Sequence, residues 1–147
     1  MTAAKPLPDA LEVIADLAEF RYFLRRFLHF SEEAANGLGV PPQQHQLLLQ
    51  IAGAKPGVET TVAYLAERLS VRHHSAVELC SRCEAAGLVR RTPAKSNRRA
   101  VVLELTPAGS EVLQSLSAAH ASELRVLGPQ LLRTLRKLTT PSMEGTR

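Results

Sequence analysis

Apolar residues recur every three or four positions along most of the chain, which is the spacing of one face of an α-helix. This pattern predicts helices over residues 9–36, 42–54, 61–69, 73–86, 107–127 and 131–138. Between residues 88 and 105 the period changes to two, which predicts two short strands, 88–91 and 99–105, joined by a polar turn. The chain is therefore expected to be mainly α-helical with one small β-hairpin.

Proline and glycine motifs set the predicted ends of these elements. Gly37-Leu38-Gly39 ends the first helix, and Lys55-Pro56-Gly57 ends the second. Thr106 is a predicted N-cap, with Pro107 at the first helical position. Gly128-Pro129 is expected to divide the last helical stretch into two helices.

The first helix and the last two are more apolar than one small lobe can bury. All four phenylalanines, at positions 20, 23, 27 and 30, fall on one face of the first helix. Residues 9–138 are predicted to form a single unit, in which the helices of 9–36 and 107–138 make a dimerisation region. A monomeric helical bundle is the alternative. Residues 1–8 and 139–147 are predicted to be flexible tails.

Composition narrows the class of protein. The chain has 147 residues, of which 45% are hydrophobic and 22% charged, so it is expected to fold around a core. It has neither an apolar run long enough to span a membrane nor the pattern of a signal peptide, which predicts a cytoplasmic protein without a membrane partner. Its two cysteines, Cys80 and Cys83, are too close in sequence to form a disulfide framework.

Positive charge is concentrated in one segment. The formal net charge is +4, and basic residues outnumber acidic ones by five between residues 72 and 99. Clustered cations suit the phosphate backbone of a nucleic acid, although a solvated basic surface has the same composition.

The order of the predicted elements indicates where in the fold this positive charge lies. A short helix from Thr61, a tight turn at Ser70-Val71-Arg72, a second helix and a basic hairpin are the parts of a winged helix-turn-helix, here within residues 42–106. In such a lobe the second helix lies in the major groove of duplex DNA, and hairpin arginines reach the neighbouring backbone or minor groove.

Several motifs resemble the MarR family of bacterial transcription regulators. Leu65-Ala66-Glu67-Arg68-Leu69 resembles the supporting helix of that family, and Gly87-Leu88-Val89 resembles the approach to its wing. Asn97-Arg98-Arg99-Ala100-Val101 with Leu105-Thr106-Pro107-Ala108-Gly109 resembles the wing and the start of the next helix. One position departs from the family, which usually carries Asp where this chain has Asn97; an Asp there would pair with the wing arginine.

The resemblance implies a homodimer that binds a pseudo-palindromic operator in double-stranded DNA and acts as a repressor. The predicted DNA contacts lie at the start and along the second helix, beside the strands and at the wing: Arg72, His73, His74, Ser75, Glu78, Arg82, Arg90, Arg91, Lys95, Arg98 and Arg99. Arg82 has an alternative role as the salt-bridge partner of Glu78, four residues earlier. A strand alternates its faces, so one of Arg90 and Arg91 is expected to point to DNA.

The resemblance also implies release by a small aromatic or phenolic effector. Residues predicted to line its cleft are Arg25, His29, His45 and Tyr64. No cofactor is predicted. The pair His73-His74 with Cys80 and Cys83 is a weak metal motif, because both cysteines fall at core positions and none of these side chains comes from a loop that could complete a site.

Three other functions are weighed against the regulator. A thiol-based redox sensor through Cys80 or Cys83 requires an exposed thiolate of low pKa. A winged helix can instead bind protein through its wing. A thiol enzyme is disfavoured, because the sequence has no Cys-His-acid arrangement and no glycine-rich phosphate loop, and the chain is not expected to be an enzyme.

Overall fold

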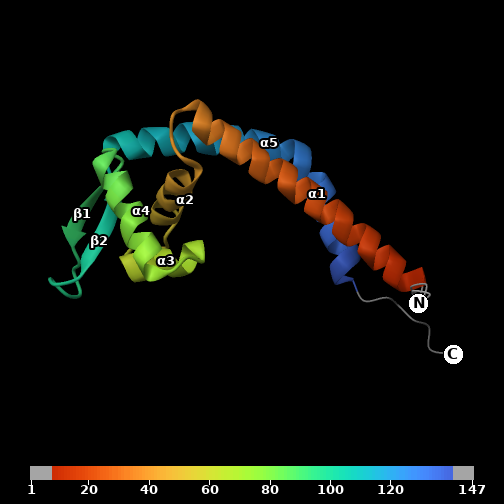
Figure 1. Cartoon of the computed structure of the whole chain (residues 1–147), viewed down its shortest axis with the longest axis horizontal. Helices are drawn as coiled ribbons and strands as arrows, with labels where there is room; N and C mark the ends of the chain where they lie inside the picture. The colour runs from red at the N-terminus through yellow and green to blue at the C-terminus, as the bar shows by residue number, and fades with distance from the viewer. Residues whose placement is uncertain (1–7, 141–147) are drawn as a thin grey trace, which may run out of the picture. The chain divides into compact units, whose positions relative to one another are not determined.

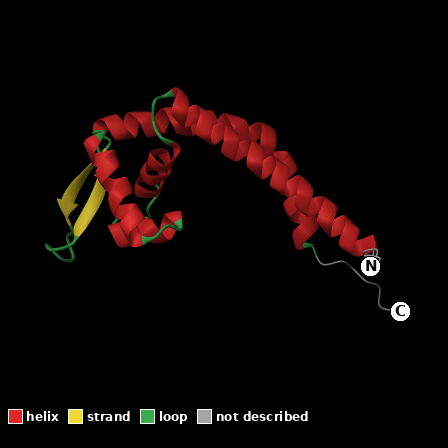
Figure 2. Cartoon of the chain, viewed as in Figure 1, coloured by secondary structure: helices red, strands yellow, loops and turns green. Residues whose placement is uncertain are grey.

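A computed structural model describes residues 8–140 of the protein, and in this range five helices and a two-stranded hairpin follow one another (Figure 1). The elements are α1 (Pro8–Gly37), α2 (Pro42–Ala52), α3 (Val62–Leu69), α4 (His73–Ala85), β1 (Val89–Pro93), β2 (Val101–Leu105) and α5 (Pro107–Thr139). Figure 2 shows the predominance of helix. The predicted fold class, mainly α-helical with a winged helix-turn-helix, is confirmed. The two predicted tails lie outside the described residues, apart from Pro8 and Thr139, which are helical, and Thr140.

The last helical stretch is one continuous helix, so the predicted break at Gly128-Pro129 is wrong. α5 contains Pro129 in its interior. A proline lacks the N–H that bonds the carbonyl four residues earlier, and this normally weakens a helix. The carbonyl that Pro129 leaves without this donor is that of Arg125. Burial of Leu127 and Thr134 on either side holds the segment in place despite this loss.

The chain divides into two compact units. One, the helix-pair unit, contains the part of α1 up to Ser31 and the part of α5 from His120; the other, the lobe, contains residues 32–119. α1 and α5 thus contribute to both units.

The core of the lobe lies among α2, α3, α4 and the hairpin. Its buried apolar residues are Val40, Leu47, Leu48, Ile51, Leu65, Leu79, Cys80, Cys83, Leu88, Val89, Leu103 and Leu113. β1 and β2 pair antiparallel, with Val89 opposite Leu105 and Pro93 opposite Val101. A proline is tolerated at this terminal strand position, because the strand needs no further N–H there.

The residues just before α3 lie alongside β2 and are hydrogen-bonded to it. The Leu103 N–H donates to the Thr60 carbonyl at 2.9 Å, and the buried Thr60 hydroxyl donates to the Leu103 carbonyl at 2.6 Å. Thr61 makes an isolated antiparallel bridge with Val102. The hairpin is therefore tied to the start of α3 as well as to the end of α4.

The start of α5 is locked to the end of α4 by the Leu-Thr-Pro-Ala-Gly motif. The Thr106 hydroxyl donates to the Gly87 carbonyl at 2.5 Å and accepts the Gly109 N–H at 3.1 Å. A Cβ on Gly109 would lie only 2.1 Å from the Leu88 carbonyl oxygen. Residue 109 must therefore be glycine for the two backbones to pack this closely.

In the helix-pair unit, α1 and α5 run antiparallel. The His120 ring lies edge-to-face against Phe27 and Phe30, with ring centroids 5.8 Å and 5.5 Å away, and a ring nitrogen is 2.7 Å from the Ser31 hydroxyl. Near the other end, Lys137 lies 3.8 Å from Asp16. No helix in the described range is long and apolar enough to cross a membrane.

Candidate nucleic-acid interface

A tight corner joins α3 to α4. The Thr61 side chain caps α3 by accepting the Tyr64 N–H at 3.2 Å. The helix ends at Leu69, its C-cap Ser70 has a left-handed backbone with φ of 54°, and the N–H of Val71 closes the turn onto the Ala66 carbonyl at 3.0 Å. The predicted turn at Ser70-Val71-Arg72 is confirmed, and it fixes the direction in which α4 leaves α3.

α4 has one buried and one exposed face. Ala76, Leu79, Cys80 and Cys83 are buried against the lobe. The opposite face exposes Arg72, His73, His74, Glu78, Ser81 and Arg82, with Ser75 half-buried at its edge. No side chain caps the first turn of α4, so its backbone N–H groups remain open to an anion.

Val77 lies differently from the other apolar residues of α4. The apolar spacing within residues 73–86 predicts that Val77 points inward, but its side chain is 38% exposed. It lies three residues after His74, at the edge of the exposed face. An apolar side chain there can contact the methyl group of thymine. Only the helical angle of Val77 relative to the core positions could have revealed this from the sequence.

The hairpin turn carries the free cations of the wing. It spans residues 94–100, and Arg99 therefore lies in the turn and not at the start of the predicted strand. The Asn97 side-chain oxygen accepts the Arg99 N–H at 3.0 Å, and the Asn97 carbonyl accepts the Ala100 N–H at 2.9 Å. Asn97 thus shapes the turn through the backbone of Arg99. Lys95, Arg98 and Arg99 are exposed, and none has an ion-pair partner within 4 Å among the described residues.

The two strand arginines, in contrast, have partners within the lobe. Arg90 bonds Glu104, directly opposite on β2, at 3.2 Å. Arg91 lies 3.4 Å from Glu84 and donates to the Ser81 hydroxyl at 3.1 Å. Such exposed pairs are weak enough to exchange for phosphate, so their DNA contacts stay a prediction.

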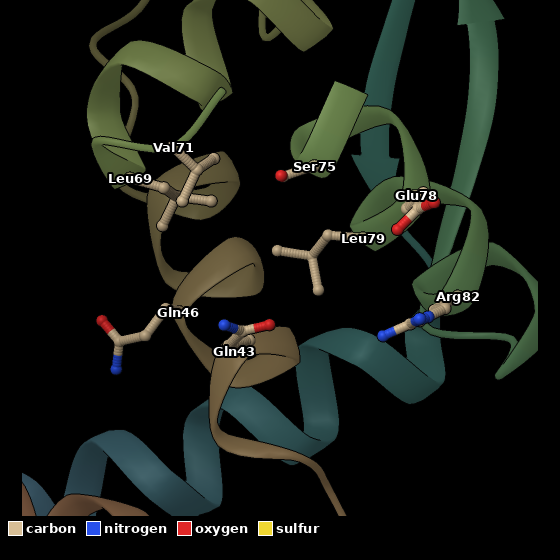
Figure 3. A pocket seen from close by; sticks show the side chains of 8 residues that line it. All are labelled: Gln43, Gln46, Leu69, Val71, Ser75, Glu78, Leu79 and Arg82. Atoms are coloured by element: carbon tan, nitrogen blue, oxygen red, sulfur yellow. The ribbon is translucent and has the colours of Figure 1, made fainter. Parts of the chain in front are cut away.

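The alternative partner of Arg82 is not found. Within residues 8–140, no ion pair joins Arg82 to Glu78. Both side chains instead line a pocket of about 340 Å³ between α2 and α4 (Figure 3). Its other lining residues are Gln43, Gln46, Leu69, Val71, Ser75 and Leu79. Sequence reasoning missed the two glutamines, since polar residues on a surface helix carry no signal of a pocket.

The thiols are poorly placed for redox chemistry. Cys80 and Cys83 are fully buried. Burial raises the pKa of the Cys80 thiol and raises the pKa of Cys83 to about 12, because a low-dielectric core disfavours the thiolate. Both cysteines therefore behave as small core residues.

The four residues predicted to line an effector cleft fall in both units. Arg25 and His29 are exposed on α1 in the helix-pair unit. In the lobe, His45 is buried and Tyr64 is half-buried against the core. None of the four lines the pocket beside α4, and their role stays a prediction.

A capped supporting helix, a tight corner, a half-exposed second helix and an antiparallel wing define a winged helix-turn-helix protein. The sequence model of the MarR family matches residues 38–100. This segment belongs to the MarR family, and the resemblance predicted from the sequence is confirmed. No curated protein matches the chain.

Solved structures show the same fold over nearly the whole chain. AbsC, a MarR family transcriptional regulator from Streptomyces coelicolor, is 22% identical with a TM-score of 0.71, covering 96% of this chain and 97% of its own. MepR F27L from S. aureus, solved bound to an oligodeoxyribonucleotide, is 17% identical with a TM-score of 0.60 (81% and 91% covered). CouR from Rhodococcus jostii RHA1, solved with p-coumaroyl-CoA, is 20% identical with a TM-score of 0.60 (80% and 86% covered).

Proposed function

We propose that the protein is a transcription regulator that binds double-stranded DNA through α4 and the wing. The observation that carries this proposal is the pairing of an exposed polar face on α4 with a turn whose three cations, Lys95, Arg98 and Arg99, have no acidic partner among the described residues. Membership of residues 38–100 in the MarR family and the DNA-bound relative MepR support it. The proposal assigns no catalytic step to the chain and places its action at bacterial DNA in the cytoplasm.

The contacts divide by type. The open N–H groups at the start of α4 and the side chains from Arg72 to Ser75 meet phosphates. Glu78 and Val77, further along the exposed face, reach base edges, where a carboxylate accepts from cytosine N4 and an apolar group meets thymine. Arg98 and Arg99 reach phosphate or the minor groove from the wing.

A homodimer is the second part of the proposal. In the helix-pair unit many large apolar side chains are exposed in one chain: Leu11, Val13, Ile14, Leu17, Tyr22, Leu28, Leu124, Val126, Leu132 and Leu135. A surface so apolar is costly in water and is typical of an interface. A second copy is the partner that this surface fits, because a two-fold dimer presents two α4 helices to two half-sites of a pseudo-palindrome.

The third part is repression released by a small molecule, for which the pocket beside α4 is the site we favour. It joins apolar walls from Leu69, Val71 and Leu79 to the charged groups of Glu78 and Arg82. An occupant would engage side chains that the proposal assigns to DNA, so binding of the two would be mutually exclusive. The ligand-bound relative CouR supports a small-molecule effector in general, without indicating which molecule binds this chain.

The test is selection of sites from random duplexes, followed by affinity measurements on the selected site at several salt concentrations. A DNA-binding regulator enriches a two-fold symmetric motif, and its log affinity falls linearly with log salt, because each neutralised phosphate releases counterions. If no sequence is enriched and affinity stays in the millimolar range at low salt, the wing serves a protein partner and the proposal is wrong.

A further inference from the structure

Glu59 stands at a fixed place beside the wing. It directly precedes Thr60, whose main chain and side chain are both hydrogen-bonded to Leu103 of β2. The bridge between Thr61 and Val102 continues this attachment. The backbone that carries Glu59 is therefore anchored to the sheet from which the wing projects.

The Glu59 carboxylate binds one residue of the wing turn with both of its oxygens. Oε1 accepts the Ser96 N–H at 3.0 Å, and Oε2 accepts the Ser96 hydroxyl at 2.7 Å. These two hydrogen bonds hold the pKa of Glu59 below its ordinary value, since they stabilise the charged carboxylate. Two-point binding of a carboxylate fixes orientation as well as distance.

The backbone of Lys95 also bonds the Glu59 carboxylate, and the other hydrogen bonds of the turn among the described residues join it to itself. The Ala94 N–H donates to the Ala100 carbonyl at 2.9 Å, and Asn97 closes the turn onto Arg99 and Ala100. Among the hydrogen bonds of residues 94–100 within the described range, those to Glu59 are the ones that tie the turn to the body of the lobe.

A carboxylate is an unfavourable neighbour for a phosphate-binding turn. Glu59 bonds the residue between Lys95 and the pair Arg98-Arg99, so its charge opposes the approach of DNA. A role for it must therefore come from geometry rather than from charge.

We propose that Glu59 is a positioning residue for DNA binding, which holds Ser96 so that Arg98 and Arg99 are presented in one orientation. The inference rests on the proposed function. We call the two hydrogen bonds from Glu59 to Ser96 the clamp. Without the clamp the turn would sample many orientations, and each DNA complex would have to order it at an entropic cost.

Three variants and one control test the clamp. Glu59→Ala removes both hydrogen bonds, and Ser96→Ala removes the hydroxyl bond alone. Glu59→Gln removes the charge but can still accept the Ser96 N–H and donate to its hydroxyl. Glu67→Ala, at an exposed position of α3, removes the same charge away from the wing.

Hydrogen exchange of the Ser96 amide in the free protein measures whether the clamp forms, independently of DNA binding. We expect exchange to accelerate at least about tenfold in Glu59→Ala, to change little in Glu59→Gln, and to be unchanged in Glu67→Ala. The melting temperature should stay near that of the wild type, since the bonds are exposed. Unchanged exchange in Glu59→Ala would overturn the clamp whatever the DNA result.

Affinity for the selected duplex measures the effect of the clamp on DNA binding. We expect Glu59→Ala to bind about 3- to 10-fold more weakly with a salt slope smaller by about one, Ser96→Ala to be intermediate, and Glu59→Gln to recover most of the affinity. Tighter binding by Glu59→Ala, with a larger slope, would show that the carboxylate only repels phosphate and would overturn the positioning role. Failure of the wild type to bind any duplex would instead refute the proposed function, and the exchange data would still decide whether the clamp exists.

Discussion

Gly109 is the residue at which the packing of the lobe is tightest. The Leu88 carbonyl oxygen occupies the space that a β-carbon would need, and this contact sets the first turn of α5 against the end of α4. Because α4 and the wing meet at Leu88 and Val89, the orientation of both depends on this one position.

We predict that Gly109→Ala destabilises the protein by about 1–3 kcal/mol, because an added methyl group meets backbone that cannot rotate away. Gly37→Ala is the matched control: its added carbon meets nothing within 4 Å, and we expect a change within about 0.5 kcal/mol. Denaturant unfolding of the two variants measures the difference. Equal stabilities would mean that the α5 start does not pack as described.

The buried thiols give a second prediction at this scale. Native protein at neutral pH should react with a thiol reagent only as fast as it unfolds, since both Cys80 and Cys83 are buried with raised pKa values. Rapid labelling of either thiol in the folded protein would revive the redox-sensor alternative.

The same pKa shift predicts a pH dependence of stability. The pKa of Cys83 is about 12 in the folded chain against an ordinary value of 9.0. The unfolded chain therefore loses this proton first as pH rises, so the associated stability is complete below pH 9 and is lost between about 9 and 12. The stability difference between the wild type and Cys83→Ala should accordingly shrink over that range, as measured by unfolding at each pH; a constant difference would contradict the buried thiol.

At the scale of single residues, the sequence predicted what local chemistry determines. The cap at Thr106 and the turn at Ser70 follow from side chains a few positions away, and they are confirmed; Thr61, predicted as the first residue of its helix, is the N-cap of α3. The bond from Glu59 to Ser96 joins positions 37 residues apart, and no local pattern predicts it. From the sequence, Asn97 differs from the usual Asp in lacking a charge to pair with the wing arginine. In the structure its side-chain oxygen instead accepts the backbone N–H of Arg99.

Among the elements, the wing is the one whose role is easiest to isolate. Arg98 and Arg99 are exposed in its turn and Val101 begins β2, so alanine at the two arginines removes charge without emptying the core.

We predict that Arg98→Ala with Arg99→Ala weakens binding to the selected duplex roughly 10- to 30-fold near 0.15 M salt and lowers the salt slope by about two. Arg21→Ala, an exposed arginine of α1, is the charge-matched control and should leave the slope unchanged. Fluorescence anisotropy across a salt series provides both quantities. A double variant with the wild-type slope would show that the wing does not contact phosphates.

Helix periodicity located every helix, but it divided α5 into two and placed several helix ends one or two residues away from their observed positions. Gly128-Pro129 is a strong local breaker, but the burial of Leu127 and Thr134 outweighs it in α5. Propensity describes an isolated helix, and packing by neighbouring elements overrides it. The exposure of Val77 has the same origin, since it depends on how α4 lies on the core and not on its residue type.

For the whole molecule, assembly depends on the apolar side chains that the helix-pair unit exposes. Ile14 is 55% exposed on α1 and Val126 is 63% exposed on α5. Leu127 lies in the helix predicted to form the dimer surface, but it is buried within its own chain and is not available to a partner. The sequence indicated that both helices are unusually apolar but could not tell which side chains one chain buries by itself.

We predict a mass in sedimentation equilibrium of twice the 16.0 kDa of one chain. Ile14→Asp with Val126→Asp should shift the protein towards the monomer, because two charges would be buried in the interface, while each is harmless to the isolated chain. Val58→Asp, at an exposed position of the lobe, is the control and should stay dimeric. A wild-type protein that remains monomeric at micromolar concentration would exclude the two-fold arrangement.

The most direct test of the regulator is methylation interference on the selected duplex, because methylation of guanine N7 blocks the major groove, where α4 is proposed to lie. We predict that methylation abolishes binding at two clusters of guanines whose centres are about one helical turn apart. Binding that tolerates methylated guanines throughout the selected site would contradict insertion of α4 into the major groove, and with it the assignment of this lobe as a reader of DNA sequence.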